Sequence, residues 1–267
     1  MNQIATQALN ALDEYISSCT VVIASTNARV HHGSGVAVMY NSQYYILTAA
    51  HVLNGEPDNQ KIRVIGKADG PLQLLRGKKE LAGAIAMNRS QVFSSATSIS
   101  ITGRLIHDGD DIAVLKVKDF NASLPHTMFH NLSVQREAQI SVGEPVSLFG
   151  FPGELAKSYE HTPTGRHGLA AFPHVTEQTI RAITDWPNML DPSVNLIVDF
   201  DYPEDKCDPH GMSGCGVWSF PMPQPNKSDV WSVNSQLLGI QMEWAKRSKL
   251  LRCVRIERVL HLLTATN

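Results

Sequence analysis

Short strand-like runs dominate this sequence, and they fall into two groups. The first group is "TVVIAS", "GVAVMY", "YYILTA", "KIRVIG", "SISITG" and "DIAVLKV", and the second is "EPVSLFGF", "EQTIRAIT", "VNLIVDFD", "GCGVWSF", "SQLLGIQMEW" and "LLRCVRI". The runs are rich in β-branched or aromatic residues and are separated by Gly, Asn, Asp and Ser, as is typical of short strands. Many short strands in two groups predict two small β-barrels or a pair of sandwiches.

A helix is expected at each end of the chain. Apolar residues recur at helical spacing at Ile4, Leu9, Leu12, Tyr15 and Ile16, and again at Ile256, Val259, Leu260 and Leu263. The predicted organisation is an N-terminal helix at 1–19, a first unit at 20–125, a linker at 126–140, a second unit at 141–255 and a C-terminal helix at 256–267. Segments 67–97 and 154–174 carry little pattern and are expected to be long loops.

Composition excludes several classes of function. The hydrophobic fraction of 43% suffices for a sizeable core, and a net charge of -2 favours neither nucleic acid nor an anionic membrane as partner. The N-terminal segment lacks the pattern of a signal peptide and no apolar stretch is long enough to span a membrane, so a cytoplasmic protein is expected. Neither a disulfide scaffold, a metal site nor a cofactor is predicted, because no CxxC pair or ligand spacing joins Cys19, Cys207, Cys215 and Cys253.

Three polar residues stand next to strand-like runs in positions that suit catalysis. His51 follows "YYILTAA", Asp111 precedes "IAVLKV", and Ser213 lies in "GMSGCG". A serine hydroxyl is a weak nucleophile unless a base takes its proton, and a glycine-rich turn lets backbone N–H groups converge on a developing oxyanion. Each residue alone has an ordinary structural explanation, so their order and their distribution over the two groups of strands decide the interpretation.

The segments "SGVAVMYNSQYYILTAAHVL", "DDIAVLKV" and "HGMSGCG" resemble those that carry the histidine, aspartate and serine of the chymotrypsin/trypsin-like serine peptidase family. The resemblance covers most of residues 20–256. It implies an all-β fold of two six-stranded antiparallel β-barrels, with the active site in the cleft between them. The first barrel, at 20–125, would carry His51 and Asp111, and the second, at 141–255, would carry Ser213.

The resemblance also implies a role for each residue. Ser213 would attack the peptide carbonyl, His51 would take its proton, and Asp111 would orient the imidazole. The N–H groups of Gly211 and Ser213 would form the oxyanion hole. Asp110 is adjacent to Asp111 but is expected to point to the opposite face, because side chains alternate along a strand.

Three positions depart from the family pattern. Cys215 replaces the second glycine after the nucleophile, and Val52 stands where secreted animal members carry a disulfide cysteine. Met212 replaces the aspartate that pairs with a newly cut N-terminus, so activation by that route is not expected. The chain more nearly resembles bacterial stand-alone peptidases, or the protease part of HtrA proteins without a PDZ domain.

The resemblance places the base of the specificity pocket at Cys207, beside Asp208, and one wall at Met242, Glu243 and Trp244. Two alternatives stay open for the preferred substrate. Trp244 closes the pocket to all but small side chains, or an acidic residue pairs with a basic side chain. The acidic candidates are Glu204, Asp205, Asp208 and Glu243.

The sequence therefore predicts a serine endopeptidase that works through a Ser-His-Asp triad and an acyl-enzyme. Regulation and restricted substrates are expected, for example in a bacterial defence or quality-control effector. The expected partners are a protein or peptide substrate and an activating protein, with neither nucleic acid nor membrane involved. The alternative is a catalytically quiet peptide-binding scaffold of the same fold.

Overall fold

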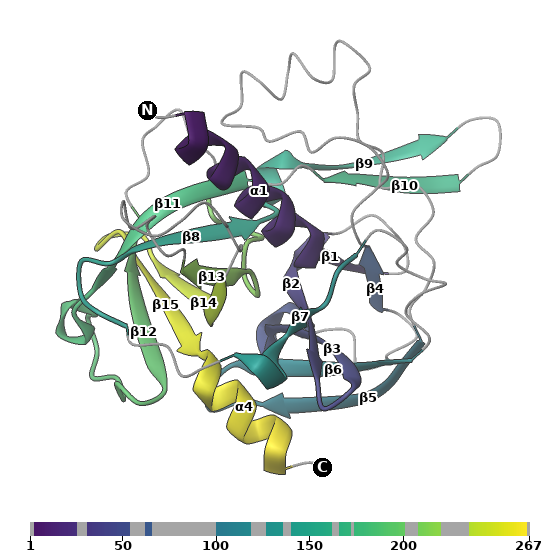
Figure 1. Cartoon of the computed structure of the whole chain (residues 1–267). Coiled ribbons are helices and arrows are strands. Elements are labelled where there is room, and N and C mark those ends of the chain that lie inside the picture. The colour runs from purple at the N-terminus through teal and green to yellow at the C-terminus, as the bar shows by residue number, and fades with distance from the viewer. Residues whose placement is uncertain are drawn as a thin grey trace.

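The chain is mostly β-structure with one helix near each end (Figure 1). The computed structural model describes residues 3–25, 31–53, 62–65, 100–118, 127–135, 140–161, 166–171, 174–200, 208–219 and 235–265. Among these residues, the two α-helices are α1 (Gln3–Cys19) and α4 (Ile256–Ala265). Neither described helix combines the length and the apolar character that crossing a membrane requires. The predicted all-β fold with a helix at each end is confirmed. Of the two expected six-stranded barrels, the described residues close one, that of the second unit, and the first unit is a sheet of seven strands.

The first sheet holds the strands of the first sequence group. Its strands are β1 (Thr20–Ser25), β2 (His31–Tyr40), β3 (Gln43–Ala49), β4 (Ile62–Ile65), β5 (Ser100–His107) and β6 (Ile112–Lys118). They follow the order β4-β1-β2-β3-β6-β5, and all neighbours along this path are antiparallel. A short strand in the predicted linker, β7 (His130–Asn131), pairs with β2 in parallel.

The second sheet closes into a barrel of six strands in the order β11-β12-β15-β14-β13-β8, as expected for the second unit. Its strands are β8 (Pro145–Gly150), β11 (His174–Arg181), β12 (Asn195–Asp199), β13 (Gly216–Ser219), β14 (Gln236–Ala245) and β15 (Leu250–Arg255). β14 contacts β3 and β1 contacts β8, so the barrel lies directly against the first sheet (Figure 1).

A hairpin occupies the segment 154–174, which the sequence pattern predicts to be a loop. β9 (Ala156–His161) pairs with β10 (Arg166–Ala171) along their whole length, and the hairpin lies at the upper right of Figure 1. The loop prediction is wrong here because neither strand contains Val, Ile or Thr, so the side-chain signal of a strand is missing, whereas the backbone groups that form the ladder are present in every residue. The other expected loop, 67–97, lies outside the described residues.

The remaining described elements are short 3-10 turns. They are η1 (Ala50–Leu53), η3 (Leu132–Val134), η4 (Gly153–Leu155) and η5 (Ile183–Asp185). Of these, η1 is the most consequential because it directly follows β3 and carries His51.

One hydrophobic core spans the two sheets. The core of the first sheet also contains residues of the second barrel, namely Phe149, Trp218, Leu237, Ile240, Met242 and Val254. Both helices bury side chains in the same core, through Leu12, Ile16 and Cys19 of α1 and Ile256, Val259 and Leu263 of α4. Burying one such side chain contributes about 2 kcal/mol. The seam between the sheets is therefore apolar and packed, which fixes the position of one relative to the other.

A buried polar chain also crosses this seam. The Tyr15 hydroxyl of α1 lies 2.8 Å from Nδ1 of His130, and Nε2 of His130 lies 2.8 Å from Oε1 of Gln135. The Gln135 amide group pairs with the backbone of Leu237 in β14, accepting from its N–H at 3.1 Å and donating to its carbonyl at 2.7 Å. This set of hydrogen bonds thus connects α1, β7 and the second barrel.

Candidate active site

His51 and Asp111 meet at one edge of the first sheet. β3 ends at Ala49 and β6 begins at Ile112, and these two residues are partners in the antiparallel ladder. The residues just after β3 and just before β6 must therefore lie close together. The backbone N–H of Ala50 donates to the carbonyl of Asp111 at 2.7 Å, which ties η1 to the turn before β6.

The Asp111 carboxylate holds His51 at two points. Oδ1 accepts the backbone N–H of His51 at 2.9 Å, and Oδ2 lies 2.7 Å from His51 Nδ1. Because an ionised carboxylate only accepts hydrogen bonds, the Nδ1 atom carries the proton. In the neutral imidazole, Nε2 is then left as an acceptor. The His51 side chain is 44% exposed, so this nitrogen belongs to a group that an external molecule can reach.

The backbone of Asp111 is unusual. Its φ angle of 59° lies in the left-handed region, which residues other than glycine rarely adopt. A hydrogen bond of 3.1 Å from its N–H to the carbonyl of Asp108 closes the turn. This sharp turn delivers the carboxylate to His51 immediately before β6 begins.

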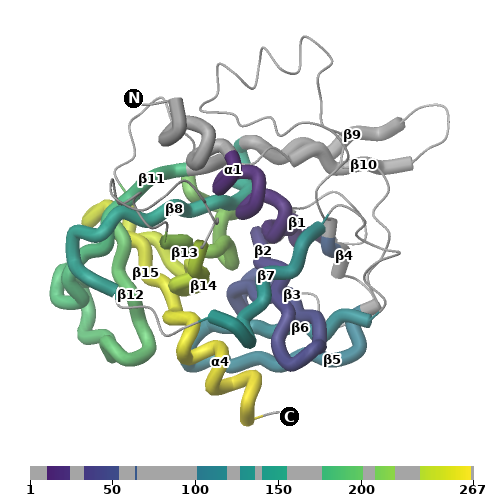
Figure 2. The backbone as a smooth tube through the Cα atoms, viewed as in Figure 1, coloured from purple at the N-terminus to yellow at the C-terminus, as the bar shows by residue number. Residues whose placement is uncertain are grey.

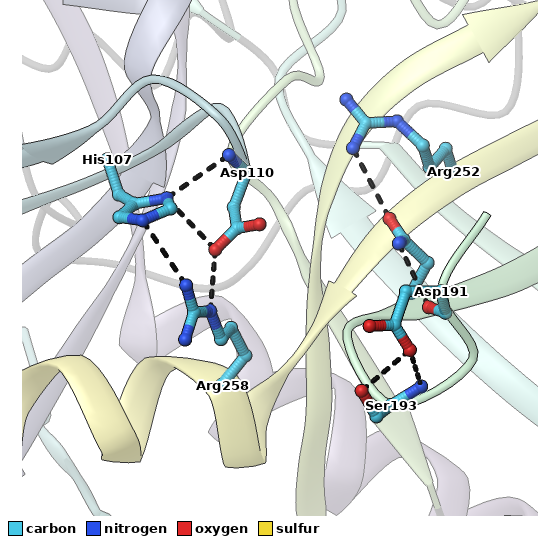
Figure 3. Close-up of polar contacts among 7 residues, drawn as sticks. His107, Asp110, Asp191, Ser193, Arg252 and Arg258 are labelled. Carbon is cyan, nitrogen blue, oxygen red and sulfur yellow. Dashed lines mark hydrogen bonds and ion pairs between the residues drawn. The ribbon is translucent and has the colours of Figure 1, made fainter.

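Asp110 points into a different cluster, shown in Figure 3. Its Oδ2 accepts from Arg258 Nε of α4 at 2.6 Å and lies 3.0 Å from Nδ1 of His107. Nη2 of Arg258 lies 3.2 Å from the other ring nitrogen of His107. The backbone N–H of Asp110 also donates to His107 Nδ1 at 3.2 Å. The Asp110 carboxylate is therefore paired with the Arg258 guanidinium of α4, whereas the Asp111 carboxylate faces the imidazole of His51.

Ser213 lies in a tight turn that directly precedes β13. The N–H of Met212 donates to the Pro209 carbonyl, and the N–H of Cys215 donates to the Met212 carbonyl, both at 2.8 Å. Gly211 and Gly214 have φ angles of 91° and 90°, which glycine adopts without strain. A Cβ atom on Gly214 would overlap the Ser34 carbonyl and the Thr48 hydroxyl of the first sheet. Only glycine therefore permits this close approach of the serine turn to the first sheet.

Two backbone donors in this turn are unused within the part of the chain that the structure describes. Among the described residues, no acceptor bonds the N–H of Gly211 or the N–H of Ser213. Backbone N–H groups without a partner cost free energy when buried away from water, so they are commonly satisfied by solvent or by a ligand.

The three residues line one cavity of about 540 Å³. Its walls are His51, Asp111, Asp208, Pro209, His210, Ser213, Gln241, Met242, Glu243 and Trp244. Four of the predicted pocket residues, Asp208, Met242, Glu243 and Trp244, are in this lining. The fifth, Cys207, and the acidic candidates Glu204 and Asp205 lie outside the described residues. Sequence reasoning passed over Pro209, His210 and Gln241, although the proximity of His210 to Ser213 in the chain was a usable signal.

The acidic groups of the cavity already have polar partners. Glu243 Oε2 accepts from Arg252 Nε at 3.1 Å. Arg252, which Figure 3 labels, also donates to Asn195 at 3.3 Å. The Asp208 carboxylate accepts the N–H of His210 at 2.8 Å. Glu243 therefore faces the cavity as one half of an ion pair, which reduces its attraction for a second cation.

Trp244 is fixed on the cavity wall by its neighbours. Its ring meets the Phe200 ring edge-on at 6.4 Å between centroids, and the Lys246 ammonium lies 5.4 Å from the Trp244 ring centroid. An aromatic pair and a cation over the ring each contribute roughly 0.5–1 kcal/mol at a partly exposed position.

Cys215 packs away from the cavity. Its side chain is fully buried in the core of the second barrel, and burial raises the pKa of its thiol. A buried thiol of this kind behaves as a small hydrophobic group. Within the part of the chain that the structure describes, no group of His, Cys, Asp and Glu side chains forms a metal site.

Comparison with known proteins agrees with this architecture. A family model described as a trypsin-like peptidase domain matches residues 33–220. Among curated proteins, none matches the chain. Human heparin binding protein shares 13% identity at a TM-score of 0.52, over 91% of this chain and 88% of that one.

Two further solved structures are similar. An atomic resolution structure of HBP matches at a TM-score of 0.56 and 13% identity, covering 95% of this chain and 92% of the other. A mutant of human heparin binding protein matches at 0.56 and 12%, with coverages of 93% and 90%. At these identities the shared property is the fold. The family match spans most of the sequence, and the chain belongs to the trypsin-like peptidase domain family.

Proposed function

We propose that this protein is a serine endopeptidase, with Ser213 as nucleophile, His51 as general base and acid, and Asp111 as the residue that orients His51. The observation that carries the proposal is the pair of hydrogen bonds from His51 to one carboxylate, at 2.9 and 2.7 Å, beside a cavity that Ser213 also lines. Fold alone does not distinguish an enzyme from a binding protein, but this constellation has a specific chemical use.

The proposed reaction proceeds through an acyl-enzyme. The Ser213 hydroxyl oxygen attacks the carbonyl carbon of the peptide bond while Nε2 of His51 takes the hydroxyl proton. His51 then gives that proton to the leaving amine, the C–N bond breaks, and the acyl group remains on Ser213. A water molecule then attacks the ester carbonyl carbon while His51 takes a proton from it. The bond between Ser213 Oγ and the acyl carbon breaks, His51 returns the proton to Ser213 Oγ, and the carboxylic acid product leaves. Asp111 keeps the Nδ1 proton and stabilises the imidazolium formed in each step.

The unused N–H groups of Gly211 and Ser213 support an oxyanion hole in the serine turn. Both tetrahedral intermediates place negative charge on the former carbonyl oxygen, which two preorganised N–H donors would stabilise. Removal of one such donor typically costs about 100-fold or more in turnover.

We further propose that Asp208, Met242, Glu243 and Trp244 form the substrate pocket together with Cys207. The fixed Trp244 ring favours small substrate side chains. A preference for basic side chains has less support, because Glu243 is paired with Arg252 at 3.1 Å. A profile of cleaved peptides tests the choice, and a basic residue at most cleavage sites would reverse it.

The residue next to Ser213 also bears on how the peptidase would be activated. Met212 is buried and offers no charge to a new N-terminus, which supports a stand-alone peptidase of the HtrA-like type that is not activated by chain cleavage. Restricted substrates and an activating protein partner, as in a bacterial defence or quality-control effector, remain part of the proposal. General cleavage of casein by the isolated chain would count against them.

The second candidate function is a catalytically quiet peptide-binding scaffold. The similar solved structures are named for heparin binding, so the fold also serves proteins known for what they bind. The His51–Asp111 geometry has no evident purpose in a scaffold, which is why the peptidase is preferred.

A fluorophosphonate probe distinguishes the two functions. We expect covalent labelling of the wild type and none of Ser213→Ala or His51→Ala, because the probe requires an activated serine. Ser193→Ala is the matched control, since this exposed serine lies outside the cavity and its loss should leave labelling unchanged. Labelling of Ser213→Ala at the wild-type rate would refute the assignment, and an unlabelled, folded wild type would favour the scaffold.

A further inference from the structure

Ser34 of β2 is a fully buried serine of the first sheet that contacts the nucleophile turn of the second barrel. Its backbone N–H donates to the Ser213 carbonyl at 2.8 Å. Its side-chain hydroxyl donates to the Gly211 carbonyl at 3.1 Å. One residue of the first sheet therefore binds the serine turn on both sides of Met212.

The orientation of the Ser34 hydroxyl is itself fixed. The backbone N–H of Phe151, just after β8, donates to Ser34 Oγ at 2.9 Å. A hydroxyl has a single hydrogen, and with one lone pair engaged by Phe151 that hydrogen points to Gly211. The Thr48 hydroxyl donates to the Ser34 carbonyl at 2.8 Å and fixes the adjoining peptide.

These bonds act on the peptide groups that flank the proposed oxyanion donors. The Gly211 carbonyl belongs to the planar peptide that lies between the N–H of Gly211 and the N–H of Ser213. Holding that carbonyl in place limits rotation of both neighbouring peptide groups. The Ser213 carbonyl, held by the Ser34 backbone, restrains the turn on its other side.

The residue directly before Ser213 carries no charge, so it cannot hold the turn through an ion pair. Met212 occupies it, with its side chain buried in the core of the second barrel. Gly211, at a φ of 91°, has the conformational freedom to rotate if its carbonyl is released.

We propose that Ser34 is a positioning residue whose hydroxyl holds the Gly211–Ser213 turn in the conformation that activity requires. The first sheet thereby contributes to the oxyanion site from outside the triad. This inference rests on the proposed peptidase function. It differs from a purely structural role, which would lower stability without changing the geometry of the serine turn.

The test compares Ser34→Ala with Thr20→Val. Thr20 is buried in the adjacent strand, where its hydroxyl donates to the Ile16 carbonyl at 2.9 Å, so both variants lose one buried hydroxyl-to-carbonyl bond. For folded protein, we expect the maximal rate of Ser213 labelling by a fluorophosphonate to fall roughly 10- to 100-fold in Ser34→Ala, in the range of a lost oxyanion donor. The probe concentration at half-maximal rate should stay unchanged, because binding of the probe does not use the oxyanion donors. Thr20→Val should label like the wild type.

A second measurement does not depend on catalysis. Amide hydrogen exchange over residues 209–215 should be faster in Ser34→Ala than in Thr20→Val, because the turn loses its side-chain restraint. A wild type that the probe does not label would count against the peptidase assignment. The hydrogen-exchange result alone would then decide the role of Ser34. Ser34→Cys, which is close in size and only a weak donor, replaces Ser34→Ala if that variant does not fold.

An unchanged labelling rate in folded Ser34→Ala overturns the inference and leaves the peptidase assignment intact. Unchanged exchange over residues 209–215 also overturns it. Loss of stability in Ser34→Ala with neither effect would assign the hydroxyl to the packing of the two sheets alone.

Discussion

At the scale of the residue, the site depends on the turn that holds Asp111. A left-handed backbone at a residue other than glycine costs roughly 1–3 kcal/mol. The turn persists because bonds to Asp108, Ala50 and His51 together determine its geometry. The same carboxylate that accepts the His51 backbone also selects the tautomer of its ring, so structure and proposed chemistry depend on one side chain.

Asp111→Asn tests this dependence. The amide would donate to Nδ1 of His51 and leave the proton on Nε2, so His51 could no longer accept the Ser213 proton. We expect the labelling rate to fall by about 10⁴-fold with the fold retained. Fluorophosphonate kinetics and circular dichroism measure the two quantities.

Asp108→Asn is the control, because this exposed residue contributes to the turn through its backbone carbonyl. It should keep nearly the wild-type rate. An Asp111→Asn enzyme with more than a tenth of wild-type activity would remove Asp111 from the triad.

At the scale of the element, the C-terminal helix α4 is part of the support of the site. The chain runs directly from β15 into α4, which leads from the second barrel toward the first sheet (Figure 2). Ile256, Val259 and Leu263 anchor the helix in the core, and Arg258 reaches the Asp110 carboxylate. Asp110 and Asp111 are consecutive, so the helix restrains the turn that presents the Asp111 carboxylate to His51.

Arg258→Gln should therefore lower activity as well as stability. We expect the labelling rate to fall roughly ten-fold, because small displacements of a positioned group are costly. The free energy of unfolding should fall by about 1–2 kcal/mol through loss of a charged hydrogen bond. Urea denaturation and labelling kinetics measure both effects.

Arg255→Gln is the matched control. Arg255 pairs with Glu257 at 3.5 Å within the same part of the chain and is not a partner of the Asp110 turn. Equal losses of rate in the two variants would show that α4 affects the site through stability alone.

At the scale of the whole molecule, the polar chain through His130 joins three parts of the structure. Burial lowers the pKa of His130, against the opposing effect of its hydrogen bond to Gln135. The titratable groups that face it are Tyr15 and Cys19 of α1. Burial raises the pKa of both, that of Cys19 to about 12, so they stay protonated and uncharged near neutral pH. The Trp218 ring lies edge-on at 5.0 Å between ring centroids and carries no charge.

The stability of the protein should consequently fall in mild acid. Because the pKa is lower in the folded than in the unfolded state, the unfolded chain binds the proton first as the pH falls. This contribution to stability is complete above the ordinary histidine pKa of about 6.5 and is lost below it. The limiting slope for one proton is about 1.4 kcal/mol per pH unit.

Urea denaturation between pH 7 and pH 5 measures this slope. His130→Phe should lose less stability over that range than the wild type, because the titrating group is gone. His261→Gln, which alters a surface histidine of α4, should keep the wild-type slope. Identical slopes in the wild type and His130→Phe would assign the acid sensitivity to other groups.

The local pattern of the sequence sufficed to predict the fold class, both terminal helices and most strands, because β-branched runs and helical spacing are short-range signals. The residues His51, Asp111 and Ser213 could be nominated for the same reason, since each stands in a compact motif beside a strand. The β9–β10 hairpin escaped prediction because its two strands lack β-branched residues. The pocket residue Gln241 escaped it because lining a cavity is a property of folded surfaces, whereas His210 stands close enough to Ser213 in the chain to have been nominated.

By itself, then, the sequence determined which segments extend and which groups could react, since both follow from neighbours a few residues apart. Only the tertiary structure decided which groups meet. The bonds of Ser34 to the Gly211–Ser213 turn, of Arg258 to Asp110 and of His130 to Tyr15 each join residues more than 100 positions apart. No local pattern specifies such pairs, because packing of the two sheets on one core brings them together and backbone geometry then aligns donor with acceptor.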